Sequence, residues 1–253
     1  MIRLIKANQP FFLSKLKLIL DKRKIKNPNI DSKTKFIVQD IKKNGDVALI
    51  KYEKKFSNFK NISLGKIKFT QVEKNTIIKK LDKKIKFSID LAYNRIFNFH
   101  KKQKLSSFSF SDRFKNTFSY KSNAINKVGV YVPGGLASYP SSVLMNCIPA
   151  IVAGVKNIYM TTPTMNGHCN PAVIYAAKKC KVKEIYKIGG AQAIAAMAYG
   201  TKTVNKVDKI VGPGNAYVAS AKKQVFGDVG IDMIAGPSEV TIVADKWSKP
   251  DWI

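Results

Sequence analysis

Three glycine-rich loops carry the residues of this 253-residue chain whose types suit ligand binding. They are 131–135 (YVPGG), 189–192 (GGAQ) and 212–215 (GPGN), and each follows an apolar run typical of a β-strand. Glycine has no Cβ and tolerates positive φ, so the backbone of such loops can approach a ligand closely. Because loops of this kind converge outside the carboxyl ends of parallel strands, they predict one crevice for a nucleotide or a similar small molecule.

Two of these loops also bring an amide side chain. Gln192 falls in the first turn of a helix whose free N–H groups and positive dipole end favour a pyrophosphate or a carboxylate. Asn215 follows a rigid Gly-Pro-Gly turn and suits the N-cap of the next helix, which alone would explain it. The chain contains no G-x-G-x-x-G sequence, so any dinucleotide must be held in a way that differs from the ordinary Rossmann fingerprint.

A fourth segment, 232–239, places a hydroxyl and a carboxylate on a loop before another apolar run. Its Ser238 has no histidine near it in the sequence, and neither His100 nor His168 has the context of a catalytic triad. A hydrogen bond to a substrate therefore suits Ser238 better than the role of a nucleophile. His168 stands beside Cys169, but two residues do not make a metal site.

The elements that must position these loops form a regular βα alternation that begins near Lys127. Strands alternating with helices at this spacing predict an α/β fold with a parallel, right-handed, doubly wound sheet. The candidate strands are 128–132, 157–161, 184–188, 209–211 and 240–244, and the candidate helices are 142–153, 171–179, 191–199 and 215–226.

The preceding part of the chain is mostly helical. We expect two helices separated by Gly45, a third opened by the capping box from Thr70 to Glu73, and a longer one from about Asp82. Alternating aromatic residues on both sides of a polar turn at 112–116 predict a β-hairpin. Such a ribbon could form the edge of a sheet or reach a partner subunit.

The formal net charge of +29 raises the question of a nucleic-acid or membrane partner. Residues 1–127 hold 32 of the 45 basic residues but 9 of the 16 acidic ones. Specific readout of bases and phosphates favours arginine, and few aromatic residues stand among these lysines as stacking platforms. The only arginines are Arg3, Arg23, Arg95 and Arg113. The pattern therefore favours a solvated lysine surface, and nucleic acid is an unlikely partner.

The N-terminal segment and the cysteines indicate where the protein works. Lys15 and Lys17 interrupt the first apolar run, so it suits an amphipathic docking helix better than a signal peptide. No stretch approaches the roughly 18 apolar residues of a membrane span. Cys147, Cys169 and Cys180 lack C-x-x-C spacing and favour neither a disulfide framework nor a structural zinc site, so a reducing cytoplasm fits best.

Five segments together resemble histidinol dehydrogenase. The resemblance covers nearly all of 127–253, whereas 1–126 agrees only in its layout of helices followed by a ribbon. It implies oxidation of L-histidinol to L-histidine through L-histidinal, the last step of histidine biosynthesis, with two hydride transfers to NAD and a bound zinc ion. The segments are 128–135 (VGVYVPGG), 139–145 (YPSSVLM), 189–196 (GGAQAIAA), 207–215 (VDKIVGPGN) and 231–240 (IDMIAGPSEV).

The resemblance also implies roles for residues on these loops. Tyr131, Gln192 and Asn215 would contact NAD, and Ser238 would contact the substrate. The protein would have two Rossmann-like domains of the aldehyde-dehydrogenase-like superfold and would act as an intertwined homodimer. In that arrangement 128–237 is the complete NAD-side domain, 1–127 is part of an incomplete first domain, and 238–253 is a return strand into it.

In the family, the zinc ligands and the Glu-His pair that handles protons correspond to positions past Ile253. We therefore expect no catalytic residue and no metal ligand in this chain, and little or no turnover by the chain alone. We also expect the half 1–127 to be unstable or aggregation-prone, because its sheet would keep exposed edges.

Two other classes of protein stay open. An aldehyde-dehydrogenase-like enzyme would need a reactive cysteine near the nicotinamide, but Cys147 lies in an apolar helical run typical of a buried thiol. The other class is a non-catalytic remnant or a nucleotide- or nucleic-acid-binding protein. Salt-sensitive DNA binding without NAD binding would favour a nucleic-acid-binding protein.

Overall fold

The computed structural model describes residues 5–22, 28–57, 59, 61–134, 139–164, 166–234, 240–249 and 251. Contacts divide the chain into two units, Met1–Pro28 with Ala235–Ile253 and Asn29–Ile234. The predicted domain limits at 127 and 237 concern the complete fold implied by the resemblance and stay predictions.

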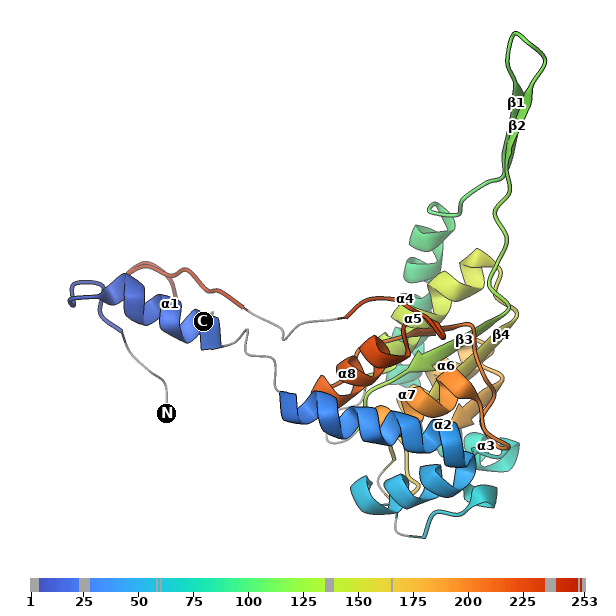
Figure 1. The fold of residues 1–253 in the computed structure, drawn as a ribbon, viewed down its shortest axis with the longest axis horizontal. Helices are drawn as coiled ribbons and strands as arrows, with labels where there is room; N and C mark the ends of the chain where they lie inside the picture. The colour runs from blue at the N-terminus through green and yellow to red at the C-terminus, as the bar shows by residue number, and fades with distance from the viewer. Residues whose placement is uncertain are drawn as a thin grey trace. The chain divides into compact units, whose positions relative to one another are not determined.

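A five-stranded parallel sheet forms the centre of the unit Asn29–Ile234 (Figure 1). Its order is β5-β4-β3-β6-β7, so the direction of winding reverses between β3 and β6. Such a switch point is where open α/β sheets bind ligands. The predicted doubly wound fold is therefore confirmed. The bounds are Lys127–Tyr131 (β3), Asn157–Thr161 (β4), Glu184–Tyr186 (β5), Lys209–Val211 (β6) and Gly230–Ile231 (β7).

The four helices predicted within the alternating region are all present, with ends that differ from the prediction by less than one turn. Asn170 and Asn215 cap two of them through their side chains, and Pro140 and Pro171 stand at first-turn positions where no N–H is needed. The bounds are Pro140–Ala153 (α5), Pro171–Lys179 (α6), Gly190–Tyr199 (α7) and Ala216–Val225 (α8).

Alternate residues of β3 point to opposite faces of the sheet, as the strand period requires. Val128 and Val130 belong to a core cluster with residues of α5 and α6. Tyr131 belongs to a second cluster with residues of α7 and α8. This cluster also contains Ile41 and Leu49 of helix α2 (Pro28–Phe56), which precedes the sheet in the sequence. Helices from the first half of the chain thus cover the sheet domain and share its core.

The first half has the predicted helices. Gly45, with φ 52° and ψ −126°, divides the helical stretch α2 into two parts. The capping box before α3 is confirmed: Thr70 N donates to Glu73 Oε2 at 2.7 Å and Glu73 N donates to Thr70 Oγ1 at 3.1 Å. Asp82 caps α4. The bounds are Pro28–Phe56 (α2), Leu64–Lys66 (a 3₁₀ turn, η1), Gln71–Lys79 (α3) and Lys83–Lys101 (α4).

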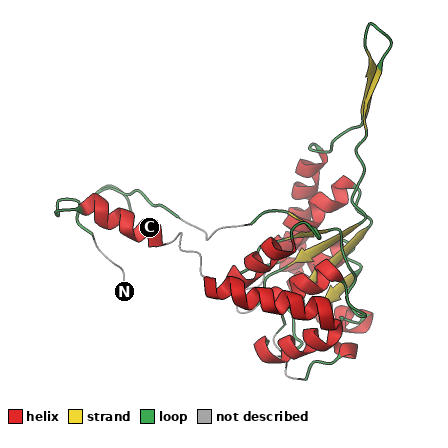
Figure 2. Cartoon of the chain, in the orientation of Figure 1, coloured by secondary structure: helices red, strands yellow, loops and turns green. Residues whose placement is uncertain are grey.

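The predicted hairpin is confirmed and extends away from the sheet as a two-stranded ribbon, drawn in yellow in Figure 2. Strands β1 (Phe108–Ser111) and β2 (Thr117–Tyr120) are antiparallel, and all their residues are exposed. Phe110 and Phe118 stack across the pair with their ring centroids 5.3 Å apart. Cross-strand aromatic pairs of this kind stabilise a hairpin locally.

Residues 67–69 cover the outer edge of β5. Lys68 forms an antiparallel bridge with Tyr186, and Phe69 N donates to Ile185 O at 3.0 Å. These contacts occupy backbone groups that would otherwise face solvent at the edge of the sheet.

The smaller unit contains helix α1 (Phe12–Lys22) and the described residues 240–249 and 251. The predicted strand at 240–244 is wrong: these residues form no strand, and Val243 is 93% exposed. Among the described residues no strand pairs with these alternating apolar residues, so the pattern alone does not produce a ladder. Of the helices described, none has the length and apolar character needed to cross a membrane.

Candidate cofactor-binding site

A cavity of about 1080 Å³ lies where the loops after β3, β4, β5 and β6 meet helix α2. All four loops leave the carboxyl ends of their strands, as expected for a ligand site in this fold. The cavity is lined by Lys33, Phe36, Ile37, Lys51, Tyr52, Glu53, Lys55, Phe56, Ser57, Tyr131, Pro133, Gly134, Pro163, Thr164, Gly189, Gly190, Ala191, Gln192, Gly214, Asn215 and Tyr217.

Three of the four predicted site residues are brought together in this cavity. Tyr131, Gln192 and Asn215 all line it, although they come from three loops. Ser238 lies outside the described residues, so its place stays a prediction. The structure therefore places the three side chains implied for NAD around one space.

Tyr131 is the last residue of β3, and its side chain is buried against the start of α7. Gly190 N donates to Tyr131 Oη at 3.1 Å. Burial, more than any other influence, raises the pKa of Tyr131 to about 12. The phenol is therefore neutral at physiological pH and keeps its own proton to donate.

Gln192 is held by a carboxylate from another part of the chain. Its Nε2 donates to Glu53 Oε1 at 2.8 Å, and Gly189 N donates to the same oxygen at 2.9 Å. Burial raises the pKa of Glu53, although these two hydrogen bonds act to lower it. Sequence reasoning missed Glu53. The available signal was a charged residue one turn after buried Leu49, on the apolar face of α2.

Asn215 caps a helix with one side-chain atom and leaves another available to the cavity. Its Oδ1 accepts hydrogen bonds from Tyr217 N and Val218 N, both at 3.1 Å, and so caps α8. The N-cap role predicted from the sequence is confirmed. Asn215 is exposed and lines the cavity, so its Nδ2 group can donate to a ligand while Oδ1 holds the helix.

An ion pair between the buried Lys222 and the partly buried Asp232 holds the glycine loop after β6. Lys222 Nζ donates to Gly212 O at 3.0 Å and contacts Asp232 Oδ1. Asp232 Oδ2 accepts from Gly212 N at 2.8 Å. Burial tends to raise the pKa of Asp232, but the hydrogen bonds from Lys222, Gly212 and Met233 outweigh it and lower that pKa. Both polar backbone groups of Gly212 are therefore fixed by one pair of side chains.

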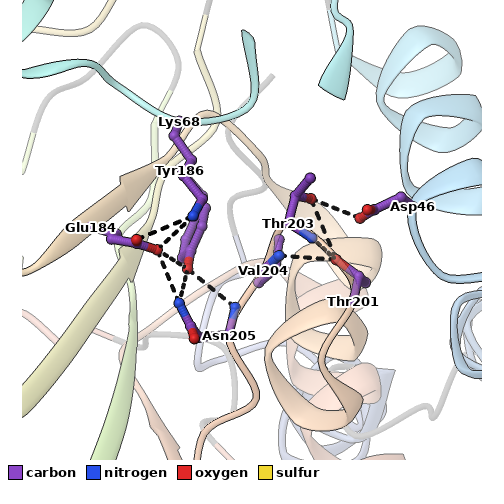
Figure 3. A network of polar contacts seen from close by, with 8 residues as sticks. All are labelled: Asp46, Lys68, Glu184, Tyr186, Thr201, Thr203, Val204 and Asn205. Atoms are coloured by element: carbon purple, nitrogen blue, oxygen red, sulfur yellow. Dashed lines mark hydrogen bonds and ion pairs between the residues drawn. The ribbon is translucent and has the colours of Figure 1, made fainter. Parts of the chain in front are cut away.

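A second polar network joins the loop after α7 to β5 and to α2 (Figure 3). Glu184 Oε2 accepts from Tyr186 Oη at 2.6 Å and from Asn205 Nδ2 at 3.0 Å. Thr203 Oγ1 donates to Asp46 Oδ1 of α2 at 2.7 Å. The network lies outside the cavity and anchors the far end of α7.

The polar side chains that line the cavity carry carboxylate, amide, hydroxyl and ammonium groups. Its described lining contains no histidine and no cysteine. Across the part of the chain that the structure describes, no three His, Cys, Asp or Glu side chains are grouped closely enough to hold a metal ion. Cys147 is fully buried away from the cavity, and a hydrogen bond with Cys180 together with burial raises the pKa of its thiol. Such a thiol is not the reactive cysteine of an aldehyde dehydrogenase.

A family model for histidinol dehydrogenase matches residues 20–253. The chain belongs to the histidinol dehydrogenase family. A histidinol dehydrogenase of Pelagibacter ubique is 56% identical across 100% of this chain, which spans 58% of that protein. One of Rhodospirillum rubrum is 50% identical over 86% of this chain and 50% of its own length.

A solved structure agrees with these relatives. The crystal structure of histidinol dehydrogenase from Elizabethkingia anophelis superposes with a TM-score of 0.79 at 39% identity, over 87% of this chain and 51% of that one. The resemblance inferred from the five segments is thus confirmed.

Proposed function

We propose that this chain forms the NAD-binding side of a histidinol dehydrogenase. The observation that carries the proposal is that Tyr131, Gln192 and Asn215 line one cavity of about 1080 Å³ at the switch point of the sheet. A cavity of this size, with apolar walls and a few convergent polar groups, fits a dinucleotide.

The side chains would share the binding of NAD between them. Tyr131 would donate through its neutral phenol, Asn215 would donate through Nδ2, and Gln192 would contribute its amide oxygen. NAD, when bound, supplies the hydride acceptor of the family's reaction. The residues of this chain would bind and orient it and keep water from one side of it.

The reaction we propose for the complete active site is oxidation of L-histidinol to L-histidine through L-histidinal. Ser238 would contact the substrate, as the resemblance implies. By the same resemblance we propose a homodimer in the cytoplasm.

Zinc does not fit the described residues. A protein zinc site takes three or four His, Cys, Asp or Glu ligands, and the described residues contain no such group. We propose that the described residues bind NAD and do not themselves hold the zinc ion that the oxidation of histidinol needs. Histidine formation from histidinol by the purified chain with zinc and NAD would contradict this part of the proposal.

Calorimetric titration of the full chain with NAD tests the binding site. We expect Gln192→Ala and Asn215→Ser each to weaken NAD binding by about tenfold, the effect of one good hydrogen bond to a ligand. Serine keeps the N-cap of α8, so Asn215→Ser separates ligand contact from helix capping.

Asn75→Ala is the matched control, because Asn75 is an exposed amide on α3 and is not among the residues that line the cavity. It should bind NAD like the unchanged chain. Failure of the unchanged chain to bind NAD at millimolar concentration, or equal affinities for all variants, would rule out the proposed site.

A further inference from the structure

Glu53 is a buried carboxylate that enters the candidate site from α2. It is 1% exposed, and its Oε1 accepts hydrogen bonds from Gln192 Nε2 and Gly189 N. A buried carboxylate is costly unless such donors compensate for its lost hydration. Both donors belong to the GGAQ loop, so the carboxylate and the loop constrain each other.

The carboxylate determines which way the Gln192 amide faces. An ionised carboxylate only accepts hydrogen bonds, so Gln192 must turn Nε2 toward Glu53 and Oε1 away from it. The amide lies close over Gly190, whose φ is +64°, and a Cβ there would be 2.9 Å from Gln192 Oε1. Gly190 therefore leaves room for the amide, and Glu53 sets its direction.

Glu53 and Tyr131 also occupy the start of α7. The N–H groups of Gly189 and Gly190 point to Glu53 Oε1 and Tyr131 Oη, respectively. In many dinucleotide-binding folds such N–H groups hold a pyrophosphate at the positive end of the helix dipole. Here these N–H groups are already occupied by side chains of the protein, and an ionised Glu53 would repel a second anion at that place.

We infer that Glu53 is a positioning residue of this site: it fixes the Gln192 oxygen as an acceptor and excludes phosphate from the start of α7. The group of the ligand that meets Gln192 is therefore a neutral hydrogen-bond donor, such as a sugar hydroxyl or a carboxamide. The identity of the ligand in this inference rests on the proposed function, whereas the contact between Glu53 and Gln192 is independent of it.

Three variants separate these roles. Glu53→Leu removes the acceptor, Glu53→Gln keeps one acceptor oxygen without charge, and Asp46→Asn is the matched control. Asp46 is also a buried carboxylate on α2, but it accepts from Thr203 and is not among the residues that line the cavity.

Nuclear magnetic resonance of the free chain reads the contact without any ligand. We expect the Gln192 side-chain amide and the Gly189 backbone amide to shift in Glu53→Leu and to stay unchanged in Asp46→Asn. In Glu53→Gln both amides should stay close to their positions in the unchanged chain, because the retained oxygen still accepts. Unchanged resonances in Glu53→Leu would overturn the inference even if NAD binds.

Titration with inorganic pyrophosphate tests the exclusion of phosphate, and titration with NAD tests the positioning of Gln192. Pyrophosphate binding is followed by the shifts of the Gly189 and Gly190 amides. Its affinity should be at least about tenfold higher for Glu53→Gln than for the unchanged chain. NAD should bind about tenfold more weakly to Glu53→Leu, and adding Gln192→Ala to that variant should weaken it little further.

The outcomes distinguish the two proposals. Equal pyrophosphate binding by Glu53→Gln and the unchanged chain would overturn the exclusion of phosphate. Should Glu53→Leu fail to fold, the pyrophosphate result with Glu53→Gln still decides. If the unchanged chain binds no NAD, the proposed function fails, while the amide shifts and the pyrophosphate titration still test Glu53.

Discussion

Gly212 lies so close to Tyr131 that a Cβ on Gly212 would stand 2.1 Å from the Tyr131 carbonyl oxygen. The φ of Gly212 is also +112°, a conformation that other residues rarely adopt. The first and third glycine loops are therefore in direct backbone contact. Their approach brings Tyr131 and Asn215 to one cavity.

Gly212→Ala should destabilise the protein beyond the cost of its φ angle alone. Gly227 provides the control, because its φ is +105° but nothing lies within 4 Å of a Cβ placed there. We expect Gly227→Ala to lower the free energy of unfolding by about 1–3 kcal/mol and Gly212→Ala by more. Urea unfolding of both variants measures the difference, and equal losses would contradict a clash at Gly212.

The Lys222–Asp232 pair should act as a unit. Lys222→Met leaves a partly buried carboxylate without its cation and should lower the free energy of unfolding by about 3 kcal/mol. The double change Lys222→Met with Asp232→Asn should cost less than the sum of the single changes. A double-mutant cycle by urea unfolding checks this, and additive losses would mean that the pair does not hold the loop jointly.

The same pair predicts a dependence on acid. The pKa of Asp232 is lowered in the folded state, so its stabilising contribution is present above the usual value of 3.8 and is lost as the pH falls through the folded pKa. Stability measured from neutral pH downward should therefore fall less steeply below that value in Asp232→Asn than in the unchanged chain.

Glu53 should show the opposite dependence on pH. Its pKa is raised in the folded state, so folding is most favoured while the carboxyl is protonated, below the usual value of 4.5. Relative to Glu53→Gln, the unchanged chain should lose stability as the pH rises from 4.5 through the folded pKa of Glu53. Urea unfolding across this range measures the trend.

Glu73 offers a comparison of opposite sign. Burial tends to raise the pKa of Glu73, but the hydrogen bond from Lys187 and those from Thr70 lower it overall. The unchanged chain should therefore gain stability over Glu73→Gln as the pH rises toward 4.5 and keep it above that value. Parallel curves for the two glutamate variants would contradict at least one of the two assignments.

The parts of the fold that depend on neighbouring residues in the sequence were predictable. The capping box of Thr70 and Glu73 spans four residues, and the Asn215 cap reaches only to Val218. The parallel sheet followed from alternating strands and helices, because few topologies satisfy that pattern. The grouping of the three glycine loops followed from the same topology.

The remaining parts depend on contacts between distant residues. Glu53 and Gln192 are 139 positions apart, and no local pattern relates them. Strand β7 has two residues, too few to form a recognisable run. The segment 240–244 has the alternation of a strand, yet a strand also needs a neighbour, which a local pattern cannot supply.

Residues 67–69 cover the outer edge of β5, so a further strand could join the sheet only at its other edge. Because Lys68 and Phe69 occupy the outer side of β5, a further chain of strand-forming sequence cannot add there without displacing them. Extension from another polypeptide would have to begin at the β7 side. The edge of the described sheet at β5 is therefore closed to strand addition, which limits the ways in which copies of the protein can assemble through their strands.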